Sequence, residues 1–114
     1  MPYFHVQTNI SIPEDRADGF LTEASKRLAK ELGKPERYVM VELTAATHLR
    51  FSGNKEPAAY VELKSIGLSE AQTQPLASFV CSFLEEQLNI PASRVYIEFI
   101  NIPGKFWGWN GGTF

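Results

Sequence analysis

A predicted order of strand, helix and strand occurs twice within 114 residues, and this duplication limits the folds that the chain can adopt. Strand-like segments stand at residues 3–9, 38–44, 58–66 and 94–102, and an amphipathic segment separates the two strands of each pair. YVMVEL in the first half is matched in place by VYIEFI in the second. Each half therefore indicates a right-handed βαβ unit. The simplest assembly is an α+β fold with one four-stranded sheet and both helices on one face.

Local signals predict where the two helices begin. Ser11 and Glu14 have the spacing of a capping box at the start of the first helix. The second helix has two compatible starts. Either Ser69 caps it and Pro75 lies in its interior, or Thr73 caps it and Pro75 lies in its first turn.

The length of the chain leaves the other face of this sheet without a cover. A chain of 114 residues has the size of a single domain, 1–114, and cannot add a second layer. The strands are too apolar for one face to be left in water. A closed ring of identical subunits would bury these faces, and we favour it over an unrelated partner.

Composition excludes several classes of function. The 11 basic and 13 acidic residues give a net charge of −2, so we expect neither a nucleic-acid partner nor binding to a membrane surface. A single cysteine, Cys81, excludes an internal disulfide, and His5 and His48 lack metal-like spacing. We predict no metal site. Without a leader or a run of ~20 apolar residues, we expect a cytoplasmic protein, with leaderless release left open.

Pro2 is the first candidate for chemistry. Removal of Met1 before a small residue would leave a secondary amine at the start of a strand. Burial or a nearby cation would have to lower the pKa of that amine for it to act as a neutral base at pH 7. The alternative is that proline simply follows the initiator methionine, as in many proteins.

Other candidates stand at the ends of the predicted strands. Lys34 lies in the turn after the first helix, where it can return toward Pro2 or merely complement the helix dipole. The backbone N–H of Ile66, in the turn SIG, can face a carboxylate. Tyr96 and Glu98 share one face of the last strand, where they line a pocket or face solvent.

Short segments carry a resemblance along the whole chain: MPYFHVQTNI, DGFL, GKP with a following tyrosine, SIG, RVYI, and a tail with GWN and TF. In their order and spacing the chain resembles the macrophage migration inhibitory factor and D-dopachrome tautomerase family of the tautomerase superfamily. The resemblance implies a homotrimer whose three sheets form a barrel inside six helices. It also implies that Pro2 is a catalytic base in a site between subunits. The substrate-binding residues that it implies are Lys34, Ile66, Tyr38, Tyr96 of the neighbouring subunit, Trp109 and Phe114.

The implied reaction is keto–enol tautomerisation of phenylpyruvate-like 2-oxo acids, for which the resemblance implies no metal and no organic cofactor. The alternative is a cytokine-like signalling ligand that acts on a protein receptor. Glu98 stands where the family commonly has asparagine, so this carboxylate bears on the substrate or, in a third hypothesis, positions water for addition to an unsaturated acid. The family's CxxC reads Ala58 to Val61 here, so we do not expect dithiol chemistry.

Overall fold

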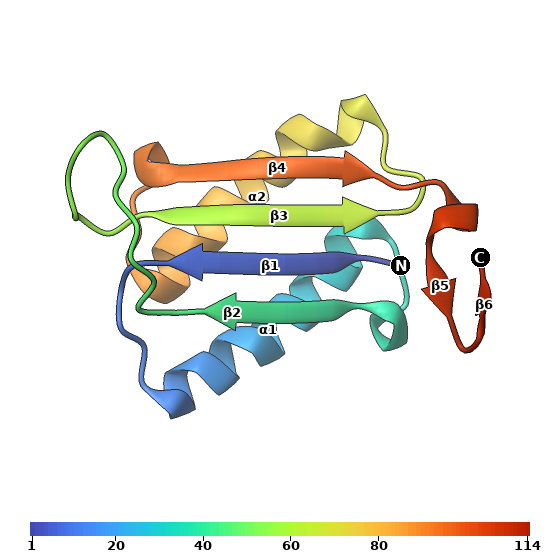
Figure 1. The fold of residues 1–114 in the computed structure, drawn as a ribbon, viewed down its shortest axis with the longest axis horizontal. Helices are drawn as coiled ribbons and strands as arrows, with labels where there is room; N and C mark the ends of the chain where they lie inside the picture. The colour runs from blue at the N-terminus through green and yellow to red at the C-terminus, as the bar shows by residue number, and fades with distance from the viewer.

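The computed structural model describes residues 1–114, and its order of elements confirms the duplicated pattern. The main elements are β1 (Tyr3–Thr8), α1 (Glu14–Leu32), β2 (Met40–Thr44), β3 (Ala59–Ser65), α2 (Glu70–Leu88) and β4 (Val95–Asn101). The sheet order is β2-β1-β3-β4; β1 pairs parallel with β2 and antiparallel with β3, and β3 pairs parallel with β4. Both helices cover one face of this mixed sheet (Figure 1), which confirms the predicted fold class.

The start of α1 differs from the prediction. The capping box at Ser11 is wrong, because the helix begins at Glu14 with Pro13 in the cap position and without a side-chain cap. A residue that precedes proline is disfavoured in helical conformation, so Ile12 cannot be the first helical residue after a Ser11 cap. Pro13 itself is extended, with ψ of 150°.

The start of α2 settles the alternative that the sequence left open. Ser69 is the cap, and Pro75 lies inside the helix. The backbone N–H of Ser69 donates to Oε1 of Gln72 at 2.9 Å, which is the return half of a capping box. The proline therefore costs one helical hydrogen bond within a helix of 19 residues.

The core lies between the sheet and the two helices. Alternate residues of β1 and β3 point toward the helices, and these side chains are almost fully buried. The largest buried side chains are Phe4, Val6, Phe20, Leu28, Val61, Leu63, Val80, Phe83, Leu84 and Ile90. Apolar residues of the edge strands, such as Val41 and Ile97, pack against the same cluster.

The uncovered face of the sheet is more polar than the composition of the strands predicted. The hydroxyl of Tyr3 donates to the Glu42 carboxylate, and the hydroxyl of Tyr60 donates to Glu98 at 2.9 Å. His5 Nδ1 lies 3.4 Å from the Glu62 carboxylate. The expectation of an apolar surface is therefore wrong for most of this face, because the apolar residues alternate onto the helix side.

A short hairpin ends the chain, and sequence reasoning did not predict its strands. β5 (Gly108–Trp109) and β6 (Gly112–Thr113) pair antiparallel across Asn110 and Gly111. These two residues have φ of 51° and 80°, as a type I′ turn requires. Figure 1 shows that this hairpin and the N-terminus lie at the same end of the sheet.

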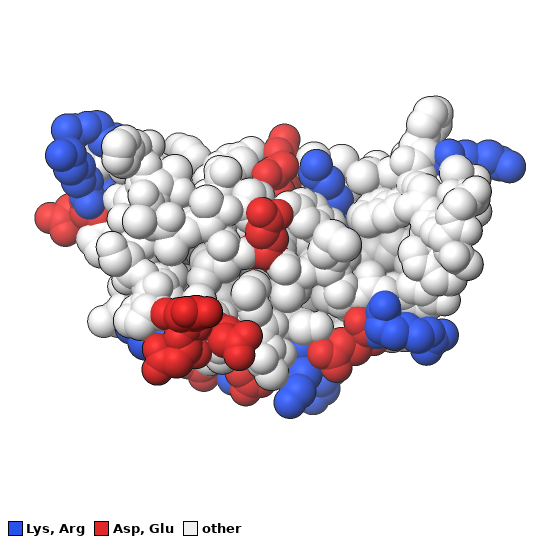
Figure 2. Space-filling model, turned by 60° about the horizontal axis from the view of Figure 1, so that its bottom comes forward, with Lys and Arg blue, Asp and Glu red and all other residues white.

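Basic and acidic side chains are interspersed on the face shown in Figure 2.

Candidate active site

Strand ends meet around Pro2 at what we call the proline end of the sheet. Pro2 directly precedes β1 and is buried, and its carbonyl accepts a hydrogen bond from the Met40 N–H at 3.0 Å. The register places Tyr3 opposite Met40 on β2 and opposite Lys64 near the end of β3. Parallel and antiparallel pairing thus bring the start of two strands and the end of a third to one point.

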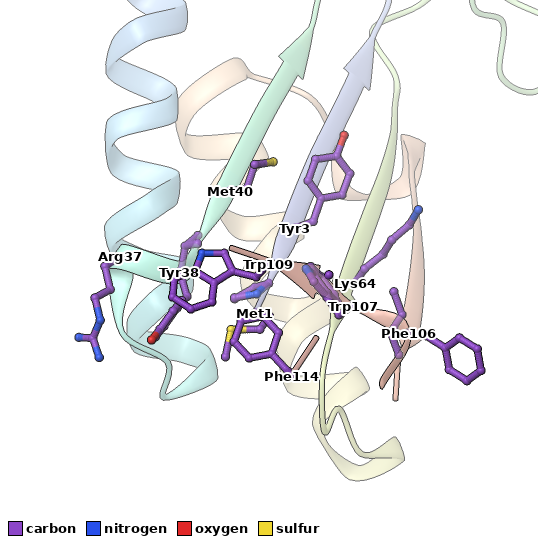
Figure 3. A pocket seen from close by; sticks show the side chains of 14 residues that line it. Met1, Tyr3, Arg37, Tyr38, Met40, Lys64, Phe106, Trp107, Trp109 and Phe114 are labelled. Atoms are coloured by element: carbon purple, nitrogen blue, oxygen red, sulfur yellow. The ribbon is translucent and has the colours of Figure 1, made fainter. Parts of the chain in front are cut away.

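A cavity of about 530 Å³ opens at the proline end. Its lining consists of Met1, Pro2, Tyr3, Arg37, Tyr38, Val39, Met40, Lys64, Ile102, Phe106, Trp107, Gly108, Trp109 and Phe114. Figure 3 shows Met1 among the aromatic rings, whereas Arg37 and Phe106 point away from the centre. Ten of the 14 lining residues are hydrophobic, so the cavity suits a ligand with an apolar or aromatic body.

Aromatic rings from two segments form one wall of this cavity. The ring of Tyr38 meets Trp109 and Phe114 edge-on at centroid distances of 5.7 and 6.0 Å, and those two rings stack at 5.6 Å. The terminal hairpin supplies the second segment, and the Phe114 N–H donates to the Trp107 carbonyl at 3.2 Å. A side chain at Gly104 would meet the Phe114 carbonyl oxygen at 3.1 Å, so glycine lets the tail pass closely.

Lys34 and Ile66 lie together beside this cavity without lining it. Gly33 ends α1 in left-handed conformation, with φ of 66°, and the turn carries half-buried Lys34 back toward β1. The Lys34 Nζ donates to the Ile66 carbonyl at 3.2 Å. Burial, and secondarily the charge of Lys34, lowers the pKa of the Met1 amine below its usual value. The structure thus brings Pro2, Tyr38, Trp109 and Phe114 into one cavity wall, with Lys34 and Ile66 next to it.

The structure does not bring Tyr96 or Glu98 to this cavity within one chain. Tyr96 pairs with Tyr60, and Tyr60 pairs with Gln7 near the far end of β1. Gln7 lies five residue steps along the extended chain from Pro2, which corresponds to about 17 Å. Tyr96 is 63% exposed, and Glu98 accepts the hydrogen bond from Tyr60.

Several lining residues were missed in the sequence. Tyr3, Met40 and Lys64 share the uncovered face, and the register makes them neighbours. Their alternation with buried residues was visible in the sequence, but the pairing that joins them across strands was not. Arg37 lies over the outer side of the Tyr38 ring, with Cζ 4.8 Å from the ring centroid.

Metal-binding clusters and membrane-spanning helices are two other features that the structure can reveal. No group of three or more His, Cys, Asp or Glu side chains is close enough to hold a metal ion. The structure contains no helix with both the length and the apolar character that crossing a bilayer demands.

Comparison with known proteins decides the family. A family model described as macrophage migration inhibitory factor (MIF) matches residues 1–114. The chain belongs to the MIF family. The rat macrophage migration inhibitory factor is 38% identical over 118 residues, covering 100% of this chain and 99% of the relative. The homolog from Brugia malayi is 39% identical over 116 residues, with the same coverage.

Solved structures of MIF proteins share the fold. The homologue from Prochlorococcus marinus superposes with a TM-score of 0.93 at 46% identity and covers 98% of each chain. The protein from Trichinella spiralis gives a TM-score of 0.90 at 34% identity, covering 98% of this chain and 99% of that one. The MIF family includes tautomerase activity and cytokine roles, and its proteins are homo-oligomeric.

Proposed function

We propose that the chain is a keto–enol tautomerase of phenylpyruvate-like 2-oxo acids and that Pro2, freed by removal of Met1, is its general base. The observation that carries this proposal is the position of the N-terminal amine. This amine, which belongs to Met1 before processing, lies at the edge of an aromatic-walled cavity, and burial and the charge of Lys34 lower its pKa. The tautomerase activity within the MIF family supports the same reaction class.

The reaction requires one group that accepts a proton and later returns it. The neutral Pro2 amine removes a proton from the carbon beside the ketone and returns it to the ketone oxygen, so that the substrate leaves as the enol. The ammonium of Lys34 and the N–H of Ile66 hold the carboxylate or the carbonyl oxygen as negative charge moves onto it. Pro2 therefore accounts for both proton transfers in this proposal.

The position of the Met1 side chain gives a physical reason for the removal of this residue. Its side chain occupies part of the cavity among the aromatic rings (Figure 3). Cleavage after Met1 would both open this space and place the amine on Pro2, which is fixed by its ring and by the hydrogen bond to Met40. The environment that lowers the pKa of the Met1 amine would then act on Pro2.

The site is completed, in this proposal, by a neighbouring subunit of a homotrimer. Tyr96 is exposed and lies near the opposite end of the sheet from the Pro2 of its own chain. A ring of three chains places the Tyr96 and Glu98 of one subunit against the cavity of the next. The homo-oligomeric state of MIF proteins supports this arrangement.

Phenylpyruvate tautomerisation by protein whose mass shows loss of Met1 tests the proposal. We expect Pro2→Gly to lower kcat by about 10²- to 10⁴-fold, the usual contribution of a general base. Pro13→Gly is a matched control, because Pro13 caps α1 away from the cavity, and we expect it to remain active. Both variants are compared at the same oligomer size. Equal activity of Pro2→Gly and the processed wild type would contradict the proposal.

A signalling ligand that binds a protein receptor is the second candidate, because the MIF family includes cytokine roles. Receptor binding that survives Pro2→Gly in an intact oligomer, together with an inactive processed wild type, would favour it.

A further inference from the structure

Arg94, which directly precedes β4, stabilises the loop between β2 and β3, residues 45–58. The Arg94 Nε donates to the Pro57 carbonyl at 2.9 Å, and Nη2 donates to the carbonyls of Phe51 and Glu56 at 3.2 and 3.0 Å. The guanidinium also lies over the Phe51 ring, with Cζ 5.2 Å from the centroid. Arg94 therefore fixes both the backbone and the ring of Phe51.

Phe51 has further constraints from the loop itself. Its N–H and carbonyl exchange two hydrogen bonds with Asn54, both at 3.1 Å, across a tight turn. Asn9 holds the next part of the loop, since its Nδ2 donates to the Glu56 carbonyl at 2.9 Å and its Oδ1 accepts from the Ala58 N–H at 3.0 Å. The same Nδ2 donates to the Leu49 carbonyl at 3.3 Å, so the backbone of this loop is fixed on both sides of Phe51.

The Phe51 ring in turn contacts Tyr96. The two centroids are 4.8 Å apart, and the rings are tilted by 60°, an edge-to-face contact. The hydroxyls of Tyr3 and Tyr60 on the same sheet face donate to glutamates, whereas the Tyr96 hydroxyl makes no hydrogen bond within the chain. An exposed tyrosine without such a bond samples several rotamers unless packing selects one.

We propose that Phe51 and Arg94 are positioning residues that hold the Tyr96 ring in the orientation required by the adjoining subunit's substrate cavity. This inference rests on the proposed function, in which Tyr96 completes that cavity. Arg94 acts through Phe51, and Phe51 acts through Tyr96. The loop is therefore a support for the site of another chain and not a part of the site at the proline end of its own.

A double-mutant cycle on phenylpyruvate tautomerisation tests the coupling. Phe51→Leu keeps an apolar side chain without the ring, and we expect it to lower kcat/KM about three- to tenfold, the equivalent of one aromatic pair. The same change in a Tyr96→Ala background is expected to have no further effect. Phe51→Tyr, which keeps the ring, should restore activity, and Arg94→Lys, which loses the planar fork, should lower it in the same direction.

Either of two results of the cycle would contradict the proposal. Phe51→Leu as active as the wild type, or equally damaging with and without Tyr96, would show that Phe51 does not act through Tyr96. An inactive processed wild type would instead overturn the proposed function, and with it the catalytic purpose of the ring.

NMR of ring-labelled tyrosine then separates the two levels of the proposal. With the Tyr96 signal assigned from Tyr96→Phe, we expect Phe51→Leu to shift it. Phe79→Leu, which removes a ring stacked on Phe83 on the helix side, should leave it in place. An unmoved Tyr96 signal in Phe51→Leu would overturn the positioning role itself.

Discussion

The two ends of the sheet are built in opposite ways. At the proline end, side chains face a cavity, and the aromatic rings of Trp109 and Phe114 are 55% and 37% exposed. At the other end, which we call the loop end, Asn9 and Arg94 make seven hydrogen bonds with the backbone of the 45–58 loop. The proline end is therefore open to a ligand, whereas the hydrogen bonds at the loop end hold the backbone there in one conformation. In our account a complete site needs the proline end of one chain and the loop end of the next.

The largest effect expected on stability comes from Asn9 at the loop end. Its side-chain amide donates hydrogen bonds to the carbonyls of Leu49, Lys55 and Glu56. Asn9→Ala leaves the Leu49 and Lys55 carbonyls and the Ala58 N–H without this partner, whereas the Glu56 carbonyl keeps its bond from Arg94, and we expect the free energy of unfolding to fall by about 2 kcal/mol. Trp109→Ala at the proline end removes a half-exposed ring and should cost about 1 kcal/mol or less.

Chemical denaturation at one fixed protein concentration measures both variants, because the stability of an oligomer depends on concentration. A larger loss for Trp109→Ala than for Asn9→Ala would reverse the proposed contrast between the two ends.

A smaller effect, on pH dependence, is expected from Lys34 at the proline end. The protonated amine cannot accept a proton, so activity falls as pH drops through the pKa of the amine. Burial and the charge of Lys34 lower that pKa in the chain that retains Met1. Lys34→Met removes the second cause, raises the pKa and should move the acidic limb of the kcat/KM profile to higher pH.

Lys34→Arg is the matched control for this shift, since it keeps the charge. An acidic limb that stays at the wild-type pH in Lys34→Met would mean that Lys34 does not influence the catalytic amine.

The smallest effect is expected from Tyr3→Phe, which alters the titration of the tyrosine hydroxyls and hardly any contact. The pKa of Tyr3 is raised to about 12, chiefly by its hydrogen bond to Glu42 and secondly by burial. The native state keeps this proton after the unfolded chain has lost it. The associated stability is therefore present below pH 10 and is lost as pH rises through 10 to 12. Tyr3→Phe should remove only the latest part of the ultraviolet tyrosinate titration, and loss of an earlier part would contradict this assignment.

The sequence predicted the sheet and its two helices, because these depend on apolar periodicity and on Gly33, which ends the first helix. For Lys34 it left two interpretations open, and the structure places this lysine near the N-terminal amine. It failed where a second local rule was stronger. Pro13 moved the start of α1, because it restrains Ile12. The terminal hairpin was missed although Asn110 and Gly111 carry the turn signal, since its strands have only two residues each.

The candidate site was predictable in part. The candidates Pro2, Tyr38, Trp109 and Phe114 line one cavity. Lys64 of its lining was missed, because its place depends on the antiparallel register of β1 and β3. Tyr96 shows the other limit: its place in one chain follows from the sheet, whereas its place in a site depends on how chains meet.

Subunit mixing is the sharpest test of whether Pro2 of one chain and Tyr96 of another chain form one site. Pro2→Gly and Tyr96→Ala chains are each expected to be weakly active alone, and they are unfolded together and refolded as an equal mixture. Every mixed trimer then contains one site with both natural residues, so phenylpyruvate tautomerisation should recover to about one quarter of the wild-type rate. If Pro2 and Tyr96 of the same chain formed the site, no mixed site would be intact. Activity that stays at the average of the two parents would contradict the account.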